Sequence, residues 1–163
     1  MNEPGPGDRI EQAALIHAPR RDVWRALADA EAFGTWFGVD LAGKRFMPGQ
    51  SVSGHLTPAG YQHLLWEVVI ERIEPERLLS FRWHPYAIDP TVDYSAEPTT
   101  LVTFSLADEN GGGTRLRISE AGFDAIPAAR REEAWRMNRE GWRIQAGNLA
   151  GYIGGRQQHP PGS

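Results

Sequence analysis

The feature that most restricts the fold of this chain is one long helical period that follows a run of short alternating segments. Residues 130–153 carry Trp142, Leu149 and Ile153 at helical spacing, whereas the segments before them alternate with a period of two. Strands joined by short turns form an antiparallel meander, and a helix must cover its apolar face. The pattern predicts an α+β protein in which a curved antiparallel sheet wraps around a long C-terminal helix.

The other elements are bounded by turn residues. A first strand is expected at 10–17, followed by two short helices at 18–29 and 31–36, with Pro19 at a position where its missing N–H costs nothing. The triple glycine 111–113 is typical of a hairpin, because a strand follows it. The remaining strands are predicted at 51–56, 64–73, 78–84, 100–106 and 114–120.

Alternation also predicts which side chains face the helix. In the segment 64–73 both alternate sets are mixed, so the facing of Trp66 and Glu67 stays open and a bulge is one explanation. Elsewhere the inner face is expected to carry Leu79, Phe81, Trp83, Val102, Phe104, Leu106, Leu116, Ile118 and Glu120.

The length of 163 residues is that of one domain, predicted at 10–153 between Pro/Gly-rich tails at 1–9 and 154–163 that are expected to be disordered. The net charge is −4 with scattered basic residues, which disfavours a nucleic-acid partner. No apolar run reaches the roughly 18 residues of a membrane span. We therefore expect a cytoplasmic protein, monomer or homodimer, without membrane insertion.

Chemical motifs are scarce. The chain has no cysteine, which excludes disulfides and thiolate metal sites. The segment GQSVS at 49–53 has Ser53 where a nucleophile elbow needs its second glycine. No metal and no cofactor are predicted, since the histidines lie far apart without ligand spacing at positions 17, 55, 63, 84 and 159.

Glu120 is the most informative carboxylate, because it belongs to the inward set of its strand. A carboxyl group in an apolar interior is the kind of group that acid/base catalysis uses. The alternative is that Glu120, at a strand end, reaches solvent or binds an arginine or a backbone amide. Both interpretations stay open from sequence.

The long helix contains Gly141, Gly147 and Gly151, each of which costs about 1 kcal/mol against alanine in a helix interior. Several tryptophans facing such a helix describe either a solid aromatic core or a small-molecule pocket. We expect Gly141 to leave room beside Trp142. The Pro-containing segment 85–98 is either a plain surface loop or a cover that closes the pocket mouth with Tyr86, Ile88 and Tyr94.

Five segments taken together resemble a known family: IHAPRRDVWRALADAEAFGTWF, IEPERLLSFRW, TLVTFSL, GGTRLRISEAGF and NREGW…NLAGYI. They are similar to the SRPBCC (START-like) superfamily, in its branch named for the activator of heat-shock-protein-90 ATPase. The resemblance spans about residues 10–153 and implies a helix-grip fold with a hydrophobic cavity between sheet and helix. By position, it implies a lining of Trp36, Phe81, Trp83, Phe104, Glu120, Asn138, Gly141, Trp142 and Gln145.

The expected function is the binding of a small hydrophobic or aromatic molecule in that cavity, rather than enzymatic catalysis. One alternative is a polyketide cyclase/dehydratase-like or hydrolase-like enzyme that uses Glu120 as acid or base. Another is a co-chaperone-like protein-interaction module that uses the arginines of the outer helix face, Arg136, Arg139 and Arg143. The resemblance supplies no universal catalytic residues.

Overall fold

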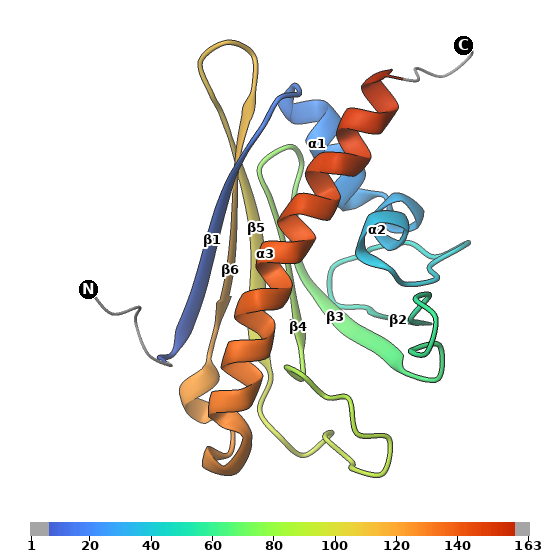
Figure 1. The fold of residues 1–163 in the computed structure, drawn as a ribbon, viewed down its shortest axis with the longest axis vertical. Helices are drawn as coiled ribbons and strands as arrows, with labels where there is room; N and C mark the ends of the chain where they lie inside the picture. Colours follow the sequence, from blue (N-terminus) through green and yellow to red (C-terminus); the bar gives the residue numbers. More distant parts are fainter. Residues whose placement is uncertain (1–6, 159–163) are drawn as a thin grey trace.

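The computed structural model describes residues 7–158 and has the predicted α+β architecture (Figure 1). Six antiparallel strands form one sheet in the order β1-β6-β5-β4-β3-β2, and helix α3 runs diagonally across one face. The helix-grip prediction is confirmed. The elements are β1 Arg9–Ile16, α1 Arg20–Ala28, α2 Ala30–Phe37, β2 Ser51–His55, β3 Leu65–Glu74, β4 Leu78–Trp83, β5 Thr100–Asp108, β6 Thr114–Ala121, the 3-10 turn Phe123–Ala125 and α3 Ala128–Gln158.

The ordered ends extend past the predicted limits. Arg9 already pairs with Ala121, and the carbonyl of Asp8 accepts hydrogen bonds from the backbone N–H groups of Gly122 and Phe123. Residues 8 and 9, which were expected to belong to the N-terminal tail, are therefore bonded to β6 and the turn that follows it. At the other end α3 continues to Gln158, beyond the expected end at 153. The rest of the expected tails, residues 1–6 and 159–163, lies outside the described residues.

The alternation in β5 and β6 is confirmed, and in β4 the inward set is as predicted, although Ser80 of the opposite set is buried as well. The side chains predicted to face the helix are buried, except Trp83, which is half-buried at the end of β4. In β3 the structure decides what the pattern left open: Trp66 is buried and Glu67 is exposed. A register shift between Ile70 and Arg72 marks a bulge in this strand.

An aromatic cluster fills the space between the sheet and the helices. At its centre lies Phe33 of α2, which is completely buried. Its ring has centroid distances between 4.7 and 6.4 Å to six other rings. Rings in such edge and offset contacts bury large apolar areas. The six neighbours are Trp36, Phe37, Phe46, Trp66, Phe81 and Phe104.

Candidate functional site

Glu120 lies on the inner face of β6, between Ile10 of β1 and Val102 of β5 in the sheet register. Its exposed fraction is 0%. It therefore does not reach solvent, and its partners are neither an arginine nor a backbone amide.

Four uncharged side chains surround this carboxylate. Oε2 accepts hydrogen bonds from Thr100 Oγ1 at 2.6 Å and from Trp83 Nε1 at 2.8 Å. Oε1 accepts from Trp142 Nε1 at 2.8 Å. Asn138 Nδ2 lies 3.0 Å from Oε1 and 3.1 Å from Oε2. Glu120 thus connects β4, β5, β6 and α3, and its charge is met by hydrogen bonds instead of a cation.

This geometry limits the chemistry of Glu120. A general acid or base must come within hydrogen-bond distance of the proton that it transfers. Both oxygens are already occupied by donors, and no part of the side chain is exposed. Proton transfer to a substrate would first require one of these donors to move. In this arrangement the carboxylate holds Trp83 and Asn138 in fixed orientations.

A pocket of about 580 Å³ lies on the other side of Trp83 and Asn138. Glu120 contacts these two residues but is not part of the lining, and the pocket lies where β3 extends past the end of β4. Apolar and aromatic residues dominate the lining, with a smaller number of polar ones. The lining comprises Phe37, Leu56, the segment 63–67, Trp83, His84, the segment 86–90, the segment 92–95 and Asn138.

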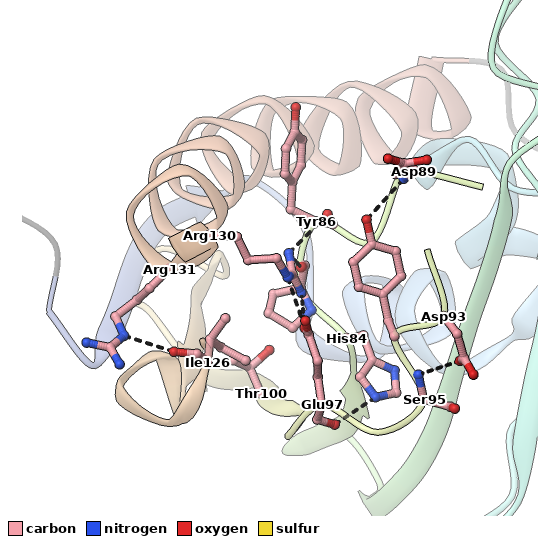
Figure 2. A network of polar contacts seen from close by, with 12 residues as sticks. His84, Tyr86, Asp89, Asp93, Ser95, Glu97, Thr100, Ile126, Arg130 and Arg131 are labelled. Carbon is pink, nitrogen blue, oxygen red and sulfur yellow. Dashed lines mark hydrogen bonds and ion pairs between the residues drawn. The ribbon is translucent and has the colours of Figure 1, made fainter. Parts of the chain in front are cut away.

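The segment 84–98 forms one wall of this pocket and is tied to the start of α3 (Figure 2). Arg130 Nη2 and Nε donate to Glu97 Oε1 at 2.7 and 2.9 Å, and its Nη1 donates to the carbonyl of Pro85 at 2.9 Å. His84 Nε2 lies 3.0 Å from the carbonyl of Glu97, which closes the base of the loop. Tyr86, Ile88 and Tyr94 line the pocket, as expected of a cover.

Asp89 and Asp93 stabilise tight turns within this loop. Asp89 Oδ1 accepts from the backbone N–H of Thr91 at 2.9 Å and from its hydroxyl at 2.7 Å. Asp93 Oδ1 accepts from the backbone N–H of Ser95 at 2.9 Å. Hydrogen bonds from Thr91 and Ser95 respectively hold the pKa of each carboxyl below its ordinary value.

The structure brings together four of the nine predicted lining residues, namely Trp83, Glu120, Asn138 and Trp142. Of these, Trp83 and Asn138 line the pocket. Phe81 and Phe104 are completely buried in the aromatic cluster. Their rings contact Trp83 and Trp142 with centroid distances of 5.4 and 5.6 Å respectively.

The other three predicted residues have separate roles. Trp36 donates to the carbonyl of Ala26 at 2.8 Å and joins α1 to α2. Gln145 donates to the carbonyl of Phe37 at 2.9 Å and joins α3 to α2. A Cβ atom at Gly141 would meet nothing within 4 Å, so this glycine is not required by close packing.

Open space surrounds the Cβ position of Gly141, whereas the ring of the neighbouring Trp142 is packed against other aromatic rings. This ring stacks on Trp83 with a centroid distance of 5.5 Å and an interplanar angle of 27°. Phe104 and Phe37 contact the same ring at 5.6 and 6.1 Å. The pocket of about 580 Å³ lies one helical turn earlier, at Asn138. Phe37 of α2, which the sequence analysis did not consider, contributes to the packing around Trp142.

Phe37 and Thr100 are the main site residues that sequence reasoning missed. Phe37 follows Phe33 by four residues on α2, a spacing that places both rings on one helix face. That signal was available. Thr100 carried the signal of its strand, because it alternates with Val102, Phe104 and Leu106 on the inner face of β5, and its hydroxyl donates to Glu120.

Arginines on the outer face of α3 form ion pairs within the helix. On the outer face of α3, Arg136 pairs with Glu132 at 2.6 Å and Arg143 with Glu140 at 2.5 Å.

Within residues 7–158, no group of three histidine, aspartate or glutamate side chains is placed to hold a metal ion. Over the same residues, none of the helices has the length and apolar character needed to cross a membrane.

Comparisons with known proteins identify relatives by sequence family and by fold. Residues 17–154 match the family model described as Activator of Hsp90 ATPase homolog 1-like protein. Among proteins with curated descriptions, none matches the sequence.

Solved structures share the fold at low sequence identity. Protein MLL2253 from Mesorhizobium loti is similar with a TM-score of 0.66 and 22% identity, over 89% of this chain and 96% of that one. A protein from Arthrobacter aurescens has a TM-score of 0.71 and 16% identity, over 90% and 86%. DynU16, from the dynemicin biosynthetic locus, has a TM-score of 0.67 and 21% identity over 91% of this chain, which spans 48% of DynU16.

Proposed function

The chain belongs to the family of Activator of Hsp90 ATPase homolog 1-like proteins, and from this premise we propose that it binds a small apolar or aromatic molecule. The proposed site is the pocket between α3, the start of β3 and the loop 84–98. The observation that carries the proposal is the size and lining of this pocket. Its volume of about 580 Å³ falls within the roughly 300–1,000 Å³ of small-molecule sites, and aromatic rings form much of its wall.

An unpartnered donor in the lining supports the same proposal. Trp66 is 6% exposed and lines the pocket, and its Nε1–H has no hydrogen-bond partner among the described residues. A buried N–H without an acceptor costs about 1–3 kcal/mol. A ligand with an acceptor atom near this indole would remove that cost.

The proposal is tested with N-phenyl-1-naphthylamine, an uncharged probe whose fluorescence rises in apolar surroundings. We expect saturable binding with one site per chain. Ala87→Trp places a large ring in the pocket lining and is expected to weaken binding by about tenfold or more, since displaced apolar contact supplies most of the affinity. Ala107→Trp, at an exposed position of β5, is the matched control and should bind like the parent. Absence of saturable binding in the parent would reject the proposal.

The enzymatic alternative retains one supporting observation. Thr100 and Asn138 supply polar groups on both sides of Glu120, and two of its donors line the pocket. A cyclase, dehydratase or hydrolase would need Trp83 or Asn138 to release the carboxylate when substrate binds. The distinguishing result is turnover that disappears in Glu120→Gln while the probe still binds.

A further inference from the structure

Acidic residues outnumber basic ones in the lining of the pocket. The residues that line it include Asp89, Asp93 and the exposed Glu67, and neither arginine nor lysine. His63 and His84 are the lining residues that gain a positive charge when protonated. A cleft lined by charges of one sign concentrates their field and attracts ligands of the opposite sign.

Asp89 and Asp93 remain available to a ligand despite their turns. The backbone N–H contacts of both turns fall on Oδ1, and both side chains are exposed. The hydrogen bonds that lower the pKa of both carboxyls favour their ionised forms at neutral pH. Both side chains therefore carry a negative charge at the pocket wall.

Glu120 adds a second source of negative potential behind the pocket. Its four partners are uncharged, so no cation cancels its charge at close range. Trp83 and Asn138 separate it from the pocket. Interactions with a buried charge are screened less than those with an exposed one, so this potential extends into the pocket.

Asn138 also presents an acceptor. Because its Nδ2 donates to both oxygens of Glu120, the other branch of the amide, Oδ1, is left for a different partner. Glu120 therefore determines the orientation of the amide, since a carboxylate accepts only from the nitrogen side. A ligand that carries N–H donors fits an acceptor oxygen held in this way.

The cation that contacts the loop is already neutralised. Arg130 forms its ion pair with Glu97, and its guanidinium lies over the ring of Tyr94, 4.7 Å from the centroid. Arg130 is not part of the lining. The contact between Arg130 and Tyr94 is a cation–π interaction within this loop. Other aromatic rings of the lining, such as those of Tyr86 and Trp83, can make the same kind of interaction with a cationic ligand.

We propose that the pocket selects ligands in which an apolar or aromatic body carries a protonated amine, and that it discriminates against carboxylates and other anions. This inference rests on the proposed function, because it names the chemical class of ligand for the same pocket. The aromatic wall contacts the apolar body. Asn138 Oδ1 and the field of the surrounding carboxylates stabilise the ammonium group.

The test compares three probes with one ring system: 2-naphthylmethylamine, 2-naphthalenemethanol and 2-naphthoate, which are cationic, neutral and anionic. Dissociation constants are measured by calorimetry at about pH 8, above the titration range of ordinary imidazoles. We expect the amine to bind about tenfold more tightly than the alcohol, and the alcohol more tightly than the acid. Equal affinities, or tightest binding of the acid, would overturn the inference while the proposed function stands. Failure of all three probes to bind would overturn both.

A variant pair locates the source of the preference. Asp89→Asn with Asp93→Asn should weaken amine binding by about threefold and leave the alcohol unchanged, since exposed charges are partly screened. Asp22→Asn with Asp108→Asn makes the same charge change on α1 and at the end of β5, at the opposite end of the molecule (Figure 1). This control pair should leave the ratio of the two affinities unaltered. An equal loss in both pairs would contradict the assignment to the pocket wall.

Discussion

The indoles of Trp83 and Trp142 stack with their ring centroids 5.5 Å apart, and both donate to Glu120, at 2.8 Å each. Trp83 ends β4, and Trp142 lies in the middle of α3. A single carboxylate thus holds the helix and the sheet at a defined separation. The stacking leaves no room for a ligand between the two rings, which moves the pocket toward Asn138 and the loop 84–98.

Replacement of Glu120 should be costly to the fold. In Glu120→Gln an NH₂ group replaces one oxygen and faces donors instead of accepting from them. Because a buried donor without an acceptor loses its full solvation, we expect a loss of about 2–4 kcal/mol in the free energy of unfolding. Urea denaturation measures it. Glu67→Gln, at an exposed position of β3, is the control and should change stability little; a similar effect of both variants would contradict the structural role of Glu120.

Arg130 should determine the order of the pocket loop. Arg130→Met removes the ion pair with Glu97 and the hydrogen bonds to the carbonyls of Pro85 and Tyr86. Amides of the loop 84–98 should then exchange with solvent about tenfold faster, because local opening loses its opposing contacts. Hydrogen exchange measured by mass spectrometry reports this. Arg131→Met is the matched control, since Arg131 donates to Ile126 and Asp124 outside the loop.

The helix glycines should be replaceable. A Cβ atom at Gly147 or Gly151 would meet nothing within 4 Å, and both positions are helical and exposed. Alanine at each should raise the free energy of unfolding by about 0.5–1 kcal/mol through backbone entropy. Thermal and urea unfolding measure the gain. Gly38→Ala should do the opposite, because Gly38 ends α2 with a φ of +101°, which disfavours any side chain.

Thr91 should control the titration of Asp89. The pKa of Asp89 lies below its ordinary value of 3.8, chiefly because the Thr91 hydroxyl donates to it. A carboxyl whose pKa is lowered by folding contributes stability above its unfolded pKa and loses it as pH falls through the folded pKa. In Thr91→Val the carboxyl-carbon NMR titration of Asp89 should move up toward 3.8. The Asp93 midpoint should stay in place, since its hydrogen bonds come from Ser95.

A pair of substitutions should show where the ligand sits. If it occupies the pocket at the loop, Ala87→Trp should weaken binding of the uncharged probe by about tenfold or more, and Gly141→Leu should leave it intact. The reverse result would place the ligand beside Trp142, as the sequence pattern suggested, and would require the stacked rings to separate. Fluorescence titration measures both, with unfolding curves to verify that each variant is folded.

Periodicity explains why much of the architecture was predictable. The strands β4, β5 and β6 have one apolar face each, so a shift of one residue would expose all their core side chains. The inward direction of Glu120 followed from the same alternation with Leu116 and Ile118. In β3 the pattern was mixed for two reasons: Leu65 and Val69 are apolar but exposed, and a bulge lies between Ile70 and Arg72. A bulge changes the alternation at a point that composition does not mark.

The sequence by itself determined the order of the elements, the face that each strand buries and the inward orientation of one carboxylate, because these depend on neighbours along the chain. Only the tertiary structure decided what that carboxylate contacts and where space remains. The partners of Glu120 come from β4, β5 and α3, far apart in sequence. The pocket is the volume left after Phe37, Trp83 and Trp142 have packed, and such a remainder depends on all the surrounding side chains at once.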